Sequence, residues 1–274
     1  MELPLTIFRD IRRYKAIKTD GLTLYPVLVR SYEDFLAARP ALEVMHQSLP
    51  VAMMRVPLLS ALYQMDYEAV LDGKTPTGLF SRALLMLALS LRLGEGKDID
   101  ERINSFQIVA DRENPAKLIC LRFTDGNGEE KEITPVQFVK LRQIIAAQNG
   151  VKLESEDANP ELVKAERDLA MLNAPKLEVS VDYAKAFISA LSGADEREID
   201  DWPILKFTRR TEALQRAMDY IVCGIGGAFG GFGKGGNPVP HPIYPKVKEH
   251  SGALISMSDF QNSALRSAAN GAPT

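Results

Sequence analysis

The longest apolar run of the chain, residues 79–93, places the strongest constraint on the fold. It contains four polar side chains and is shorter than the roughly 18 to 20 apolar residues that a membrane-spanning helix needs. A helix that is apolar on nearly all sides must be covered by other elements. We therefore predict a central, buried helix that Thr75-Pro76 opens and that Gly94 and Gly96 close.

Two local patterns predict antiparallel β structure. Near the N-terminus, Asp20-Gly21 lies between β-forming runs, and this dipeptide favours a tight hairpin turn because its backbone tolerates positive φ. Farther along, short β-forming runs at 106–109, 117–123 and 129–133 are separated by turn-forming residues. The connections between these runs are too short for parallel crossovers, so we predict an antiparallel meander.

The rest of the chain has the periodicity and the caps of helices. Thr134 and Gln137 have the spacing of a capping box, with Pro135 at the first helical position. The helix that follows ends at Asn149-Gly150, and its predicted buried side chains are Phe138, Leu141, Ile144 and Ile145. The predicted fold class is α+β, mainly α-helical with a small antiparallel β meander and an N-terminal β-hairpin.

The order of these elements predicts three regions. Residues 1–150 form an N-terminal α+β domain that contains the hairpin, the meander and the helices around them. The acidic, polar stretch at 151–158 follows as the best boundary, and residues 151–224 form a helical region. Residues 225–274 are rich in glycine and proline and are predicted to be a flexible tail with a weak terminal helix.

The charge balance and the few histidines and cysteines argue against several function classes. With 33 Lys and Arg against 36 Asp and Glu, the net charge is -3, so the chain lacks the basic excess of a nucleic-acid binder. The chain has 3 histidines, and none has the short spacing of a metal-ligand pair. Cys120 and Cys223 are typical of buried thiols in a reducing compartment. We predict no catalytic residue, no bound metal and no cofactor.

The glycine-rich segment 224–236 suggests a phosphate-binding loop but differs from one in detail. Seven of the eleven residues at 226–236 are glycine. A P-loop requires glycine where this chain has Ala228, and Ser or Thr where it has Gly235. The glycines also follow a helix, whereas a dinucleotide-binding loop follows a strand. A nucleotide- or phosphate-binding enzyme that uses this segment stays the alternative to the interpretation given below.

A long helix is predicted after Trp202-Pro203, reaching about Gly224. Its apolar residues recur at helical spacing, which predicts a buried face made of Ile204, Phe207, Leu214, Met218 and Ile221. Basic side chains share the opposite side, where an acidic partner surface or a phosphate could bind: Lys206, Arg209, Arg210 and Arg216. A solvated face, balanced by Glu212 and Asp219, is the simpler interpretation of these charges.

The tail contains spaced aromatic residues, Phe229, Phe232 and Tyr244. A flexible Gly/Pro-rich segment can become ordered on contact with a partner, and aromatic side chains are suitable anchors for that contact. We predict that these three residues, together with the basic set on the long helix, form the partner-binding surface.

Several segments of the chain also carry a family resemblance. The helix at 133–150 ends in Gln-Asn-Gly, and an acidic spacer separates it from Asn-Pro-Glu-Leu at 159–162. A second acidic stretch, at 194–202, leads into the long helix. In these features the chain resembles proteins encoded in the tail-gene modules of phages and prophages of Gram-positive bacteria, including small tail assembly chaperones. The chain differs from them in its added N-terminal half and its Gly/Pro-rich end.

The resemblance implies a non-enzymatic protein-protein interaction protein of a phage-type tail module. Such a protein acts as an assembly chaperone or as a minor tail structural component, and its expected partners are other tail or assembly proteins, with a homo-oligomer left open. The N-terminus has an acidic residue where a signal peptide has basic ones, so we expect the protein in the cytoplasm of a bacterial host, with incorporation into a phage-like particle left open.

Overall fold

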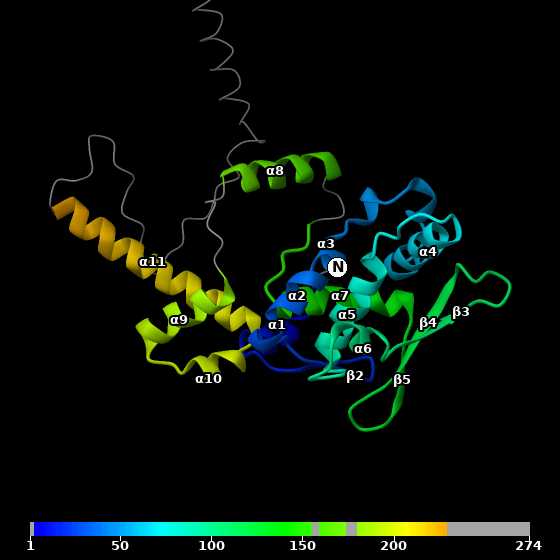
Figure 1. Cartoon of the computed structure of the whole chain (residues 1–274), viewed down its shortest axis with the longest axis horizontal. Helices are drawn as coiled ribbons and strands as arrows, with labels where there is room; N and C mark the ends of the chain where they lie inside the picture. The colour runs from blue at the N-terminus through cyan, green and yellow to red at the C-terminus, as the bar shows by residue number, and fades with distance from the viewer. Residues whose placement is uncertain (1–2, 155–158, 174–179, 229–274) are drawn as a thin grey trace, which may run out of the picture. The chain divides into compact units, whose positions relative to one another are not determined.

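The structure is a computed structural model and describes residues 3–154, 159–173 and 180–228 (Figure 1). The chain divides into two compact units, Met1–Thr211 and Glu212–Thr274. The division lies inside the last helix of the described residues. The first unit contains the apolar core and both sheets. The domain boundaries predicted at residues 150 and 224 stay predictions.

The described residues are mainly helical and contain two small antiparallel sheets, which confirms the predicted fold class. The helices are α1 (Leu5–Arg12), α2 (Tyr32–Ala38), α3 (Pro40–Glu43), α4 (Leu58–Leu71), α5 (Leu79–Leu91), α6 (Ile99–Ile103), α7 (Pro135–Gln148), α8 (Pro160–Asn173), α9 (Val181–Ser192), α10 (Glu196–Asp200) and α11 (Ile204–Ala228). Short 3-10 turns occur at Val29–Ser31, His46–Ser48 and Val51–Met53. The strands are β1 (Ile17–Thr19), β2 (Leu22–Leu24), β3 (Gln107–Ala110), β4 (Leu118–Thr124) and β5 (Glu130–Ile133).

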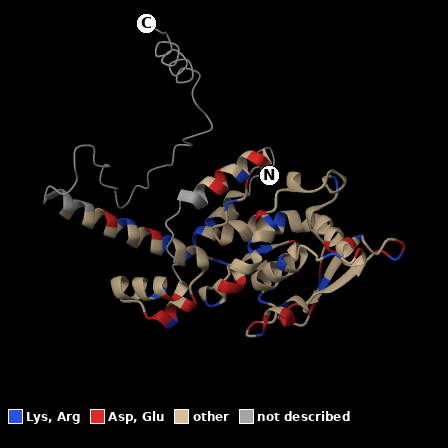
Figure 2. Ribbon diagram, turned by 45° about the horizontal axis from the view of Figure 1, so that its top comes forward, with Lys and Arg blue, Asp and Glu red and all other residues tan. Residues whose placement is uncertain are grey.

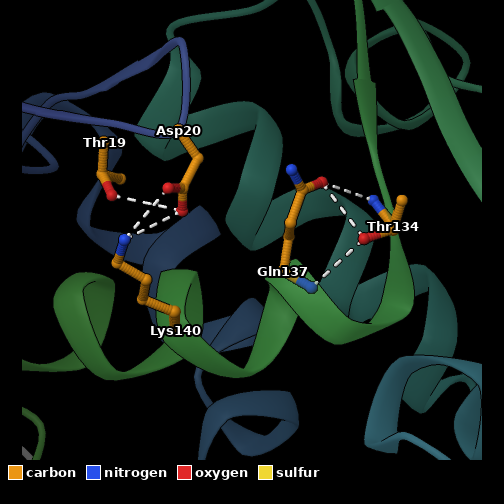
Figure 3. A network of polar contacts seen from close by, with 5 residues as sticks. All are labelled: Thr19, Asp20, Thr134, Gln137 and Lys140. Atoms are coloured by element: carbon orange, nitrogen blue, oxygen red, sulfur yellow. Dashed lines mark hydrogen bonds and ion pairs between the residues drawn. The ribbon is translucent and has the colours of Figure 1, made fainter.

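The predicted N-terminal hairpin is confirmed, with a two-residue turn between Thr19 and Leu22. Asp20 and Gly21 both have positive φ, 50° and 75°, as this kind of turn requires. Figure 3 shows that the ammonium of Lys140, on α7, donates to the carboxylate of Asp20, with Nζ at 3.0 Å from each of its two oxygens. A long-range ion pair therefore connects the turn to α7.

The central apolar helix is α5, and it packs against α2, α3, α4, α6 and β2. Side chains around its whole circumference are buried, Leu84, Leu85, Met86, Leu87 and Ala88 among them. Other elements cover this helix on several sides, as an all-round apolar helix requires.

The prediction that Thr75-Pro76 opens α5 is wrong, because the helix begins at Leu79. The reason is a tertiary cap. The carboxylate of Asp66, on α4, accepts hydrogen bonds from the backbone N–H groups of Thr77, Gly78 and Phe80 at 2.7 to 3.2 Å. N–H groups at a helix N-terminus have no acceptor within the helix, and here the carboxylate of Asp66 is their acceptor. At the other end Arg92, ahead of Gly94, has the left-handed backbone conformation.

The antiparallel meander is confirmed, with strand order β3-β4-β5. In the pairing of β4 with β5, Arg122 faces Glu132, and their side chains form an ion pair at 2.8 Å. The capping box before α7 is also confirmed and can be followed in Figure 3. The hydroxyl of Thr134 accepts from the N–H of Gln137 at 3.3 Å, and Oε1 of Gln137 accepts from the N–H of Thr134 at 2.9 Å.

The start of α11 is attached to the core through an extended segment that follows β2. The N–H of Ile204 donates to the carbonyl of Val27 at 2.9 Å, and the N–H of Val29 donates to the carbonyl of Trp202 at 2.9 Å. The N–H of Val27 donates in turn to Oδ1 of Asn149, a buried residue at the end of α7, at 2.9 Å. Backbone hydrogen bonds and one buried amide thus fix the position where α11 begins.

Gly150, just after α7, allows a test of this attachment. Its φ is +73°, and a Cβ added there would lie 3.0 Å from Cδ1 of Leu205 on α11. Gly193 has a similar φ of +70° but nothing within 4 Å of an added Cβ. We expect Gly193→Ala to cost about 1 kcal/mol of unfolding free energy through backbone strain alone, and Gly150→Ala about 2 kcal/mol because it also displaces Leu205. Urea denaturation measures both values, and equal values would contradict the packing of Leu205 on Gly150.

Candidate partner-binding surface

An ordered pair of side chains lies at the start of α11: Lys206 is in the first turn, and Trp202 lies two residues before the helix begins. Trp202 is buried, and its indole N–H donates to Oε1 of Glu198 at 3.3 Å. The ammonium of Lys206 lies 3.7 Å from the centroid of the indole ring. A cation at this position is attracted by the negative face of the ring. The predicted basic residue Lys206 is therefore held in one place on a rigid aromatic surface.

Arg209 and Arg210 follow in the next turn of α11, and both side chains are exposed. Within the described residues, neither guanidinium has a hydrogen bond or an ion pair. Three and four residues separate them from Lys206, so the helical spacing puts all three on one side of α11. Acidic residues also occur along α11 (Figure 2). We call Lys206, Arg209 and Arg210 the basic surface.

Arg216, the fourth predicted basic residue, belongs to the second unit. Its Nε atom is buried and has no hydrogen-bond partner among the residues that the structure describes. The structure thus assigns three of the predicted basic residues to the first unit and one to the second.

The apolar side of α11 agrees with the prediction only in its first turns. Ile204 and Phe207 are buried, and the ring of Phe207 packs edge-to-face with Tyr32 of α2 at a centroid distance of 6.0 Å. The prediction that Met218 and Ile221 are buried is wrong, since they are 36% and 49% exposed. Helical spacing identifies which side chains share a side, but it contains no information about whether another element covers that side.

The aromatic residues predicted as anchors, Phe229, Phe232 and Tyr244, lie outside the described residues. Of the glycine-rich segment 224–236, only the first part is described. There α11 continues as helix through Gly224 to Ala228, beyond the end predicted from the sequence. The larger part of the predicted tail, with its terminal helix, also lies outside the described residues.

The isolated titratable residues of the sequence have ordinary structural positions. Cys120 is buried in β4, and burial, with the nearby carboxylate of Glu132 as a second cause, raises the pKa of its thiol. The ring of His46 contacts the carbonyl of Met53 at 3.3 Å. Across the described part of the chain, no cluster of His, Cys, Asp and Glu could hold a metal ion. The side chain of Cys223 is not described.

Trp202, which supports Lys206 of the basic surface, was not predicted as a functional residue. From the sequence, Trp202-Pro203 was expected only to precede the helix. The available signal was the spacing of Trp202 and Lys206, four residues apart across a helix start, which brings two side chains together.

No protein-family model matches the chain, and no curated protein or solved structure matches it. The resemblance to phage tail-module proteins therefore depends on the sequence features alone. Among the helices of the described residues, none has both the length and the apolar character needed to cross a membrane.

Proposed function

We propose that this chain is a non-enzymatic protein-protein interaction protein of a phage-type tail module, acting as an assembly chaperone or as a minor tail structural component. The observation that carries the proposal is the basic surface, where Arg209 and Arg210 are exposed and lack an acidic partner within the described residues. The tail module itself is inferred from the sequence resemblance. The partner is a tail or assembly protein that presents an acidic surface.

The chemistry of the basic surface favours a protein carboxylate as its target. A guanidinium donates paired hydrogen bonds that match the geometry of a carboxylate. Lys206 is already held on Trp202, so its ordering requires less conformational entropy on binding. Opposite charges on the two proteins accelerate their encounter and make the affinity sensitive to salt.

The second unit provides a separate apolar surface for the same role. Ile221, Val222 and Ile225 share one side of α11 by helical spacing and are between 49% and 59% exposed. Exposed apolar side chains that lie close together often mark a contact with another protein. In an assembly chaperone, such residues cover apolar surface of the client protein until that protein assembles.

The test uses the purified products of the genes next to the one that encodes this chain, titrated against it by calorimetry. We expect Arg209→Glu with Arg210→Glu to weaken binding of the partner about tenfold or more, because like charges then oppose each other. The matched control is Arg12→Glu with Arg13→Glu, an adjacent exposed arginine pair on and just after α1, with an expected effect of less than about twofold. Trp202, the only tryptophan of the sequence, reports contact at Lys206 through its fluorescence.

Three results would contradict this function. The first is the absence of binding to any neighbouring gene product, and the second is equal weakening by both arginine pairs. The third is a rise in melting temperature with ATP, since a ligand stabilises the folded state that binds it. That third result would support the alternative, a nucleotide-binding enzyme that uses residues 224–236. A flat titration with duplex DNA at low salt is expected under the proposal.

A further inference from the structure

A polar cavity lies in the first unit, away from the basic surface. It has a volume of about 390 Å³ and is bounded by the β1-β2 hairpin, the end of α5 and the turn between β4 and β5. Its polar lining includes Thr23, Tyr25, Arg92, Asp125 and Lys131. This volume falls within the range of roughly 300 to 1,000 Å³ that is typical of small-molecule sites.

Tyr25 and Arg92 form the most ordered part of the cavity wall. The guanidinium carbon of Arg92 lies 4.5 Å from the centroid of the Tyr25 ring. The N–H of Tyr25 donates to the carbonyl of Ser90 at 2.7 Å, so the strand end and the helix end are attached to each other. A guanidinium stacked on a ring keeps its N–H donors in its own plane, where they remain available to a ligand.

Arg92 also has an unfavourable backbone conformation for its residue type. Its φ is 58° and its ψ is 34°, the left-handed conformation that glycine usually provides at the end of a helix. An arginine at this position is strained, and strained residues occur often at binding sites. Glycine would adopt this conformation without strain but has no side chain. The arginine found here therefore agrees with a role for its guanidinium.

Two charged side chains of the cavity lining can bind a ligand, and the first of them is Arg92. Lys131 pairs with Glu129, and Glu95 pairs with Arg30. Arg92 has no ion pair within the described residues.

Asp125 is the second group. Its Oδ1 accepts the N–H groups of Asn127 and Glu129 at 2.9 and 3.0 Å, and these hydrogen bonds lower the pKa of its carboxyl group. The nearby ammonium of Lys131 is a further cause of the lowered pKa. Among the described residues, the lining therefore offers the guanidinium of Arg92, which has no ion pair there, and the carboxylate of Asp125, which the ammonium of Lys131 also attracts.

We propose that this cavity binds a small carboxylate that also carries an ammonium or hydroxyl donor, the class of amino acids and hydroxy acids. The carboxylate of the ligand pairs with the guanidinium of Arg92 through two charge-assisted hydrogen bonds. The donor of the ligand faces Asp125. The two protein charges have opposite signs, which favours a ligand that is itself of mixed charge or polarity over a simple anion.

The test compares two ligands of the same carbon skeleton, L-threonine and butyrate, at equal ionic strength. Butyrate has the carboxylate but neither donor. We expect saturation-transfer NMR and calorimetry to detect threonine with an affinity that is roughly millimolar or tighter, and butyrate about tenfold more weakly, since hydrogen bonds to charged groups contribute that much. No binding of threonine, or equal binding of both ligands, would overturn the proposal.

Two variants connect the binding to its residues. Arg92→Met is expected to weaken threonine binding about tenfold or more, whereas Arg112→Met, at an exposed arginine of the β3-β4 turn, is expected to leave it unchanged. Asp125→Asn keeps an oxygen for the two turn hydrogen bonds, so the fold is retained, and it is expected to reduce the preference for threonine over butyrate. If Asp125→Asn leaves this preference intact, or Arg92→Met binds as the unmodified chain does, the site is wrong.

Discussion

Replacing Leu87 with alanine is expected to lower the free energy of unfolding by about 3 to 5 kcal/mol, the range for a fully buried leucine in a core that cannot collapse around the cavity. Leu87 has 0% exposure, in the helix that packs against α2, α3, α4, α6 and β2. Because several elements surround it, none can move into the space without losing other contacts. The substitution therefore removes apolar contacts and leaves a cavity as well.

Urea denaturation followed by circular dichroism measures this effect, with the slope of the unfolding line checked for two-state behaviour. Leu71→Ala is the matched control. Leu71 lies at the end of α4 and is 69% exposed, so its truncation is expected to change stability by less than about 0.5 kcal/mol. Equal effects of the two substitutions would mean that α5 is not the centre of the core.

Replacing Arg142 with methionine is the second large effect, with an expected cost of about 2 to 4 kcal/mol. Arg142 lies on α7 and is buried. Its Nε donates to the carbonyl of Leu42 at 2.8 Å, and its Nη2 donates to the carbonyl of Val44 at 2.6 Å. These carbonyls lie at the end of α3, a short helix whose last carbonyls have no partner within the helix. Methionine retains the apolar length of the side chain but leaves them without this donor.

Arg39→Met supplies the control because it makes the same chemical change next to the same helix. Arg39 is about half exposed and pairs with Glu43 at 2.8 Å, and an ion pair of this kind contributes less than about 1 kcal/mol. The difference between the two variants in urea denaturation measures how much more the buried guanidinium of Arg142 contributes to stability than the half-exposed one of Arg39. If Arg142→Met costs no more than Arg39→Met, then the carbonyls of Leu42 and Val44 find other partners.

The parts of the fold that were predictable depend on a few neighbouring residues. The hairpin turn requires two positive φ values, which Asp20-Gly21 supplies. The start of α7 requires reciprocal hydrogen bonds between Thr134 and Gln137, three residues apart. In both cases the interacting groups are neighbours in sequence, so their pattern can be identified without knowledge of the tertiary structure.

The start of α5 shows where such reasoning fails. The sequence suggested Thr75-Pro76, a good local signal, whereas the helix starts at Leu79 because Asp66 of α4 caps it. The side chain that decides this boundary belongs to another helix. Its position depends on how α4 and α5 pack, which local pattern does not specify.

The features of the candidate site also separate into those that follow from the sequence pattern and those that depend on packing. Helical spacing placed Lys206, Arg209 and Arg210 on one side of α11, and that arrangement follows from periodicity alone. The packing of Lys206 on Trp202 and the exposure of Ile221 depend on which neighbours cover each side chain. The cavity at Tyr25 and Arg92 depends on the meeting of a strand and a helix end far apart in sequence.

The amino-acid pattern was enough to predict the fold class, the hairpin, the meander, the burial of the apolar helix and the side of α11 on which the basic residues lie. These features result from backbone preferences and from the period of apolar residues, which act over short distances along the chain. Packing between elements sets where α5 begins, which part of the apolar stripe of α11 is exposed and which charged groups of the described residues form ion pairs. Those outcomes depend on contacts between residues that are distant in sequence, and such contacts form only when the elements pack.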